Sequence, residues 1–293
     1  ADWLPLAKRA RENAHECVDT VFNYGTALAR AGRFHEALDE YRLALRIAPP
    51  DWKVRILNHL GIVSRTVGKP EEAIRWHKKA LSIDPDNIDI KQDLAIATLD
   101  VGRINEGLQL HEVRRAISKR KRKAGAKPET QGILPTGIKH WQNEPLIGKS
   151  ITVYHEEGIG DLFMWARFLP LLKWMGADKI FLTGKNRDVL EFVQDQFGIV
   201  DGIVPLSGPI TTDYVVGSLT FPWRCGIEYS SVKGVPYFHA QPAKIPRRGL
   251  LDVGLVWRGN SDFPRDYQRS MAFREFIPLF DLSGVAFYSL QIG

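Results

Sequence analysis

From residue 150 onward, short apolar runs rich in β-branched residues alternate with segments of helical periodicity. The helical segments are 162–174 and 187–197, and each apolar run predicts a short strand. Four such runs occur, at 151–154, 179–183, 202–205 and 213–216. Strands and helices alternating at this spacing predict parallel βαβ units with right-handed crossovers and helices on both faces of the sheet. The predicted fold of this part is therefore a doubly wound α/β sheet.

The N-terminal part of the chain contains a repeated helical pattern instead. Alignment of Gly25 with Gly61 places further small or turn-forming residues in register at the same offset of 36 residues. These pairs are Gly32 and Gly68, Ala37 and Ala73, Ala44 and Ala80, and Pro49 and Pro85. The pattern resembles the tetratricopeptide repeat, a helix-turn-helix unit of about 34 residues, with the extra residues expected near 50–53. Small residues at these positions allow two antiparallel helices to pack closely.

A third, weaker repeat follows, with Gly102 and Gly107 in register but Arg114 where a small residue belongs. We therefore expect a helical-repeat domain over 1–118 with about three units, close to the minimum that buries a continuous core. The helix predicted from 104 to about 118 is expected to contact the next domain. Two functions remain open for this array: a concave surface that holds a peptide or protein, and a rigid spacer or oligomerisation element.

The positive charge is concentrated in one segment. The chain of 293 residues is 44% hydrophobic and 25% charged with a net charge of +6, which is ordinary for a globular protein. Eight Lys or Arg and no acid fall between 114 and 127, which leaves a net charge of about −2 for the rest. We interpret 119–149 as a basic linker and lead-in. A nucleic-acid or anionic-lipid site is a less favoured alternative, because no aromatic residues are interleaved for base stacking.

Targeting and redox signals are sparse. No apolar run approaches the length of a membrane span, and the N-terminal residues lack the apolar centre of a signal peptide. Cys17 and Cys225 show no metal-ligand spacing and are expected to be reduced structural thiols. The sequence therefore predicts a soluble cytoplasmic protein without a transmembrane segment, and it leaves the oligomeric state open.

A glycine loop follows the first predicted strand. Gly158 and Gly160 interrupt the apolar run, and Asp161 is predicted to be the N-cap of a helix beginning at Leu162. A strand, a loop and a helix N-terminus in this order form the ligand-binding edge of many open parallel sheets. The simpler alternative is a tight turn with a capping aspartate. Pro170 is expected to kink the helix.

The segment from His155 to Ala177, HEEGIGDLFMWARFLPLLKWMGA, resembles bacterial glycosyltransferases that carry tetratricopeptide repeats. These enzymes are related to the lipopolysaccharide heptosyltransferases and, more distantly, to O-linked N-acetylglucosamine transferase. The resemblance implies a GT-B fold, with 150–241 as the first Rossmann-like domain, and an inverting reaction without metal or cofactor. A tryptophan segment similar to that around Trp141 precedes the first strand in this family.

The resemblance also implies roles for the loop residues. Asp161 corresponds to the general base, and Glu157, Gly158 and Gly160 correspond to the acceptor-side loop. A carboxylate that accepts N–H bonds has a lowered pKa and is a weaker base, so Glu156 and Glu157 are alternative acids. A histidine at a strand end, His155, is expected to be a packed core residue.

A second loop follows a strand predicted at 251–257, within a segment, 242–293, that we interpret as a linker and the start of a second Rossmann-like domain. In the resembled family this domain holds a nucleotide-diphosphate sugar, the donor substrate. Guanidinium groups of Arg265 and Arg269 suit a diphosphate, and the backbone near Gly259 offers N–H donors. With Asn260 and Ser270, these residues complete the predicted donor site.

The chain ends at Gly293, whereas the resembled enzymes continue well beyond this point. The second domain would therefore contain one βαβ unit, which is too small for an independent parallel sheet. Two functional hypotheses follow. One is a GT-B glycosyltransferase that transfers sugar to an unknown acceptor, with the repeats recognising acceptor or partner. The alternative is a non-catalytic interaction or structural protein that lacks most of the donor half.

Overall fold

The protein is described by a computed structural model that covers residues 3–14, 17–123, 137–156, 158–239, 248, 250–259, 266 and 270–291. The chain forms two compact units, Ala1–Phe238 and His239–Gly293. The first unit contains the helical repeats and a four-stranded sheet, which the sequence predicts to be separate domains. The four-part division at 118, 149 and 241 remains a prediction.

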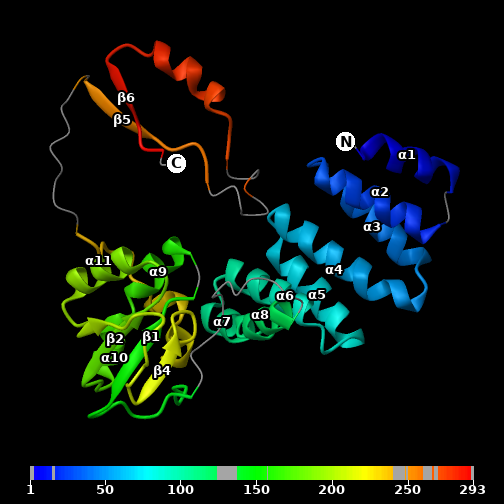
Figure 1. Cartoon of the computed structure of the whole chain (residues 1–293). Helices are drawn as coiled ribbons and strands as arrows, with labels where there is room; N and C mark the ends of the chain where they lie inside the picture. The colour runs from blue at the N-terminus through cyan, green and yellow to red at the C-terminus, as the bar shows by residue number, and fades with distance from the viewer. Residues whose placement is uncertain are drawn as a thin grey trace. The chain divides into compact units, whose positions relative to one another are not determined.

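The repeat region is a series of helices in which each helix from α1 to α6 packs against the next, and α8 packs against α6 (Figure 1). Eight helices are present in the described residues: α1 (Leu4–Asn13), α2 (Val18–Arg30), α3 (Phe34–Ile47), α4 (Pro50–Thr66), α5 (Pro70–Ile83), α6 (Ile88–Asp100), α7 (Ile104–His111) and α8 (Arg114–Lys123). The extra residues expected near 50–53 lengthen the start of α4, which has 17 residues against 13 in α2.

Close packing explains the repeated small residues. A Cβ atom added to Gly25 would lie 3.0 Å from the Tyr41 ring, and one added to Gly61 would lie 2.4 Å from the His77 ring. Both rings are completely buried between their helix pairs. The turns also repeat, because Gly32 and its equivalents adopt the same left-handed conformation with φ of 77°. The predicted helical repeats are confirmed.

The helix predicted from 104 to about 118 is wrong in one respect, since α7 ends at His111 and α8 begins at Arg114. The Arg114 guanidinium donates to the His111 carbonyl at 3.2 Å and so caps the end of α7. Helix α8 continues to Lys123, so the predicted linker begins within a helix. Residues 124–136 of that linker lie outside the described part of the chain.

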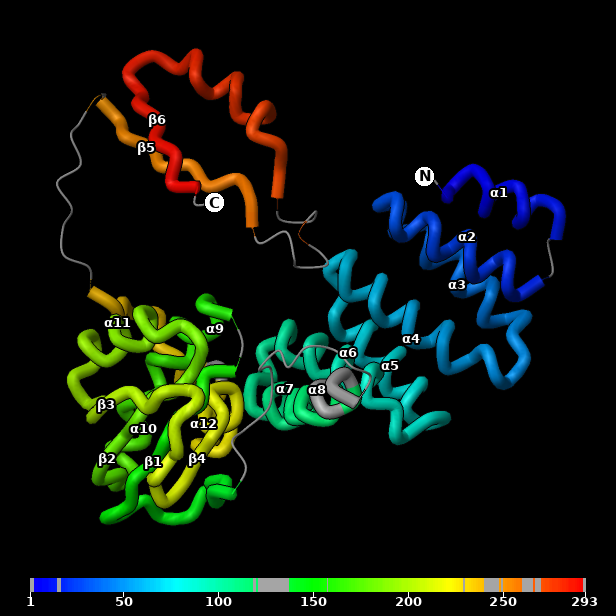
Figure 2. The backbone as a smooth tube through the Cα atoms, in the orientation of Figure 1, coloured from blue at the N-terminus to red at the C-terminus, as the bar shows by residue number. Residues whose placement is uncertain are grey.

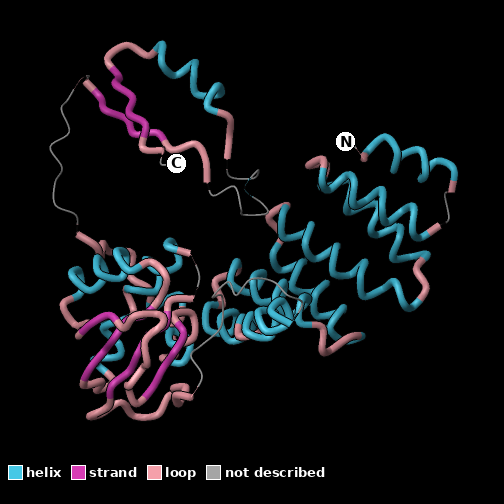
Figure 3. Tube along the Cα trace, in the orientation of Figure 1, coloured by secondary structure: helices cyan, strands magenta, loops and turns pink. Residues whose placement is uncertain are grey.

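The sheet of the first unit contains four parallel strands in the order β3-β2-β1-β4 (Figures 2 and 3). They are β1 (Ser150–Tyr154), β2 (Lys179–Thr183), β3 (Gly202–Ile203) and β4 (Tyr214–Gly217). The intervening helices are α9 (Ile159–Ala166), α10 (Leu169–Trp174) and α11 (Arg187–Phe197), followed after β4 by α12 (Phe221–Arg224) and the 3₁₀ turn η1 (Tyr229–Ser231). The predicted parallel α/β region is confirmed.

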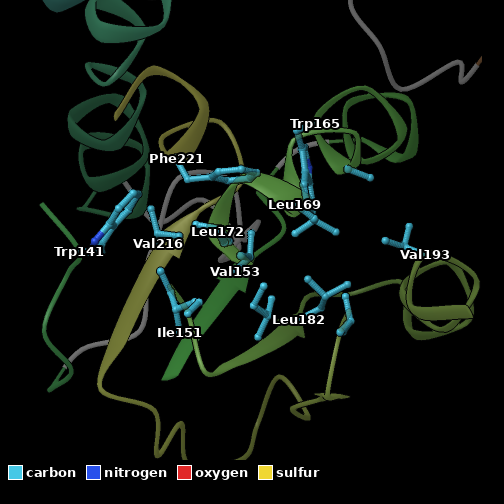
Figure 4. Packing of buried hydrophobic residues seen from close by; sticks show 14 of the residues in the cluster. Trp141, Ile151, Val153, Trp165, Leu169, Leu172, Leu182, Val193, Val216 and Phe221 are labelled. Carbon is cyan, nitrogen blue, oxygen red and sulfur yellow. The ribbon is translucent and has the colours of Figure 1, made fainter. Parts of the chain in front are cut away.

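The main core lies on one face of this sheet. Ile151, Val153 and Leu182 point toward helices α9 to α12, which contribute Trp165 and Phe221 (Figure 4). Trp141 is also buried in this core, and its indole N–H donates to the Glu144 carbonyl at 2.8 Å.

The opposite face of the sheet is packed differently. Tyr154 and Val215 contact Ile138 and Ile210, which lie in loops. The crossover at 204–213 contains two prolines and a glycine, which disfavour a helix. Helices on both faces were predicted, but this face is covered by loops in the described residues.

The first helix after β1 begins earlier than predicted. Gly158 is the N-cap and α9 starts at Ile159, so Asp161 is the third helical residue rather than the N-cap. The predicted interruption at Pro170 is confirmed, because α9 stops at Ala166 and Pro170 lies in the first turn of α10.

The second unit contains the parallel strands β5 (Leu251–Leu255) and β6 (Val285–Ser289), joined through a 3₁₀ helix, η3 (Phe273–Asp281). The predicted strand-helix-strand order is confirmed. The helix is of the 3₁₀ type and contains Pro278, which cannot donate a backbone hydrogen bond. None of the described residues of this unit is buried.

Candidate functional site

The carboxyl edge of the four-stranded sheet is built around the end of β1. The His155 N–H donates to the Thr183 carbonyl at 2.8 Å, and the Glu156 N–H donates to the Ser218 hydroxyl at 3.3 Å. These bonds place Glu156 between the ends of β1 and β4. From β1 the chain continues to β2 on one side of it, whereas β4 lies on the other side, so the strand order reverses at the end of β1. Ligands commonly bind at such a point in open parallel sheets.

The Glu156 side chain is turned toward β4. Its Oε2 accepts from the Leu219 N–H at 3.4 Å. A Cβ atom added at Gly217 would lie only 2.0 Å from this oxygen. Gly217 therefore provides the space that this carboxylate occupies. The Glu156 side chain is fully buried.

Arg114 reaches this carboxylate from the end of the repeats. Its Nη2 lies 2.7 Å from Glu156 Oε2 and 3.0 Å from the Thr220 hydroxyl, and only 5% of the Arg114 side chain is exposed. The expected contact between the end of the array and the next domain is thus present. Arg114 occupies the strand-end position where a ligand was expected.

Two further charges complete the cluster. Arg114 Nη1 lies 2.6 Å from Glu112 Oε1, and Arg115 Nη2 donates to the Thr220 hydroxyl at 2.7 Å. Burial opposes ionisation of Glu112, but Arg114 and Arg115 outweigh it and hold the pKa of Glu112 below its usual value. The buried pair of Arg114 and Glu156 and the partly buried Glu112 therefore form one ionic cluster, which favours a structural role for Glu156 over that of an alternative acid.

His155 is a core residue, as expected. It is 4% exposed and packs against Trp165, with 6.1 Å between ring centroids. Neither ring nitrogen has a hydrogen-bond partner among the described residues, and burial lowers the pKa of His155 to about 4. The ring is therefore neutral at neutral pH.

The glycine loop lies at the start of α9. Asp161 is half-buried, and its Oδ2 accepts from the Gly158 N–H at 3.1 Å. Gly158 and Gly160 are exposed, and a side chain at Gly160 would meet none of the described residues within 4 Å. Packing therefore does not require glycine at Gly160. Glu157, the remaining residue predicted for this loop, lies outside the described residues.

The predicted donor loop of the second unit is described in part. The Gly259 N–H donates to the Ser270 hydroxyl at 2.8 Å, and that hydroxyl donates to Asp266 at 2.8 Å. Two of the predicted residues are thus adjacent, and the Gly259 N–H is already bonded. Asn260, Arg265 and Arg269 lie outside the described part of the chain.

The repeats contain a second candidate site, an open groove of about 800 Å³. Helix α2 forms its floor with Phe22 and Arg30, α4 contributes Arg55, and the segment at the start of α1 contributes Trp3 and Leu6. Sequence reasoning expected a repeat groove but did not identify these residues, because α1 lies outside the repeated pattern.

Two other kinds of site are absent from the described residues. No helix there is both long and apolar enough to cross a membrane. No group of three potential metal ligands from His, Cys, Asp and Glu occurs among the same residues. Cys17 and Cys225 are unpaired, and burial raises the pKa of Cys225 to about 12.

Comparison with known proteins supports the repeats. Residues 15–86 match the tetratricopeptide repeat family. No curated protein matches the chain. Among solved structures, MamA is similar at 20% identity and a TM-score of 0.35, covering 41% of this chain and 69% of MamA. YrrB, described as a TPR protein with an unusual peptide-binding site, is similar at 15% identity and a TM-score of 0.33, covering 42% of this chain and 69% of YrrB.

Proposed function

We propose that this chain is an interaction protein that holds a segment of a partner protein in the groove formed by α1, α2 and α4. The observation that carries this proposal is the open groove of about 800 Å³ in a region that matches the tetratricopeptide repeat family. Such repeats stack into extended surfaces that suit protein or peptide partners. A peptide-binding TPR relative, YrrB, agrees with this class of function.

The floor of the groove is well packed. Phe22 is 1% exposed and packs against Tyr41 at 5.4 Å and His59 at 4.8 Å between ring centroids. The Tyr41 hydroxyl is hydrogen-bonded to both Thr26 and His59. A preformed surface loses little conformational entropy when a partner binds, which favours recognition.

Photo-cross-linking tests this proposal. A benzoylphenylalanine at Asn23, which is exposed and lines the groove, is expected to capture a discrete partner in extracts of the source cells. The same probe at Lys78, which is exposed on α5 and does not line the groove, is the matched control. Equal capture from both positions, or none from Asn23, would refute a groove-bound partner.

A second candidate function is sugar transfer by a GT-B glycosyltransferase. The parallel strand order β3-β2-β1-β4 supports a Rossmann-like first domain. The glycine loop and α9, which directly follow β1, support it as well. The parallel pair β5 and β6 and the adjacency of Gly259 and Ser270 support the start of a second one. In this proposal Asp161 is the base, a nucleotide-diphosphate sugar is the substrate, no cofactor is used, and the reaction takes place in the cytoplasm.

Release of nucleoside diphosphate from a panel of nucleotide sugars tests this second candidate. Turnover that Asp161→Asn reduces by about a hundredfold or more would support a base at this position. Glu191→Gln, an exposed change on α11, is the control for a general effect of charge removal. Absence of turnover with every donor would remove this candidate while leaving the interaction proposal intact, and equal turnover by Asp161→Asn would remove Asp161 as the base.

A further inference from the structure

Among the described residues, the groove of the repeats has positive charge without a balancing acid. Arg30 and Arg55 both line it and are exposed, and neither has an ion-pair partner within the described residues. No Asp or Glu is among the described residues that line the groove. Neighbouring arginines outside the groove differ, since Arg11 is paired with Glu40 at 2.9 Å and Arg33 with Glu36 at 2.5 Å.

Aromatic contacts hold one of these charges over the groove floor. The Arg55 guanidinium lies 4.4 Å from the centroid of the Phe22 ring and 5.3 Å from that of Trp52. A guanidinium that stacks on an aromatic face keeps its N–H edge available for a carboxylate. Arg55 is thus oriented for an anionic ligand.

The two arginines lie near a common point. Burial, followed by the positive charges of Arg55 and Arg30, lowers the pKa of His59 to about 4. His59 therefore stays neutral, while the two guanidinium groups supply the charge around it. A carboxylate placed between them would gain from both.

The wall from α1 adds an apolar surface. Trp3 is 66% exposed and Leu6 is 63% exposed, and both line the groove. Exposed apolar residues that border a groove are typical of interaction surfaces. A ligand that carries a carboxylate next to an apolar side chain would satisfy the arginines and this wall at once.

We propose that the groove selects an acidic segment of its partner, in which Asp or Glu residues adjoin apolar ones and the carboxylates pair with Arg30 and Arg55. This inference rests on the proposed interaction function and specifies its partner. Beyond the groove itself, the inference is supported by the charge of Arg30 and Arg55, which have no ion-pair partner among the described residues.

Selection from a phage-displayed library of random peptides of about twelve residues tests the inference with the full chain. The selected sequences are expected to be enriched in Asp and Glu next to apolar residues. Fluorescence anisotropy measures the affinity of a selected peptide. We expect the affinity to be lower by about tenfold or more for Arg30→Gln/Arg55→Gln than for wild type, and the affinity of wild type to fall as the salt concentration rises. Arg30→Lys/Arg55→Lys keeps the charge and is expected to retain part of the affinity. Arg75→Gln, an exposed change on α5, is the matched control.

A groove-filling variant, Asn23→Trp, separates failure of this inference from failure of the proposed function. Peptides that lose binding to Asn23→Trp but show no acidic enrichment would overturn the acidic preference and leave the groove as a binding site. Acidic peptides that bind Arg30→Gln/Arg55→Gln and wild type equally would also overturn it. If no selected peptide is sensitive to Asn23→Trp, both the inference and the proposed function fail.

Discussion

Strands β2 and β5 have the same length of five residues and belong to parallel pairs, but their surroundings differ. In β2, Ile180 and Leu182 are completely buried under helices. In β5, Leu251 is 58% exposed, and none of the described residues of its unit is buried. A local strand-helix-strand pattern therefore specifies parallel pairing but not a core, because a core requires covering elements on the sheet.

The exposed apolar side chains of the second unit illustrate the same difference. They are Leu250, Leu251, Val256, Met271, Phe273, Ile277, Leu279, Phe280, Leu282 and Leu290. Such a unit obtains little stabilisation from burial, whereas the first unit combines a buried apolar core with a buried ionic cluster. Hydrogen exchange measures the free energy of opening of each strand separately, so it can test this comparison within one chain.

The largest expected effect comes from Arg114→Met. Because the substitution leaves the buried Glu156 carboxylate without its partner, we expect a loss of about 3–5 kcal/mol in the free energy of unfolding. Hydrogen exchange at β1 and β4 should accelerate accordingly, with no change at β5.

Two controls accompany this prediction. Arg120→Met, also in α8, removes an exposed, solvent-screened pair with Asp89 and should leave the stability almost unchanged. Arg114→Met/Glu156→Gln should recover much of the loss, since no unpaired charge remains. If Arg114→Met is as stable as wild type, the cluster does not stabilise the contact between the repeats and the sheet.

Sequence reasoning could not predict this cluster. Arg114 stands out in the sequence because it replaces a small residue of the repeat and begins the basic segment, but neither feature points to Glu156, which is 42 positions away. Local patterns define elements well, as β2 and α11 show, since both have the predicted bounds of 179–183 and 187–197. They carry no information on which long side chain crosses between elements.

The glycine loop shows a second limit of sequence reasoning. Glycines disfavour helix interiors, so the helix was expected to begin after Gly160. The penalty is smaller in the first turn, where N–H groups lack intrahelical partners in any case, and α9 begins at Ile159. The sequence therefore predicts correctly that Asp161 lies at the N-terminal end of the helix, but Asp161 is the third helical residue and not the N-cap.

The second largest effect is expected for truncation of a core side chain. Leu182→Ala in β2 removes a completely buried side chain and should cost about 2–5 kcal/mol. Leu255→Ala in β5 removes a half-buried one and should cost less than about 1 kcal/mol. Urea denaturation with hydrogen exchange at each strand measures both. Equal losses in the two strands would contradict the difference in packing.

Acidification provides a third test, because a buried neutral histidine, His155, directly follows the last residue of β1. The pKa of His155 is lowered to about 4 in the folded state, from an ordinary value of 6.5. The contribution of the neutral ring to the free energy of unfolding is complete above about pH 6.5. It is lost as the pH falls toward 4, because the unfolded state binds the proton more readily than the folded state. We expect the free energy of opening at β1, measured by hydrogen exchange, to fall by up to about 3 kcal/mol.

His155→Phe keeps an aromatic ring and removes the titrating group, so its exchange at β1 should depend less on pH. The comparison is made between about pH 7 and about pH 5, after correction for intrinsic exchange rates. His77 has a pKa of about 4 for the same reason of burial and should give a similar dependence in the repeats. An unchanged pH dependence in His155→Phe would show that this histidine is not responsible.

The smallest effect in the series, and the most direct comparison, comes from a matched pair of glycines. A Cβ atom at Gly217 in β4 would lie 2.0 Å from Glu156 Oε2, and one at Gly254 in β5 would lie 2.4 Å from Leu290 Cδ1. The carboxylate is buried and ion-paired, so it cannot move freely, whereas Leu290 is 58% exposed and can change rotamer. We expect Gly217→Ala to cost about 1–3 kcal/mol through overpacking and Gly254→Ala to be nearly neutral. Urea denaturation of both variants measures the difference, and a larger cost for Gly254→Ala would mean that the second unit is packed as tightly as the first.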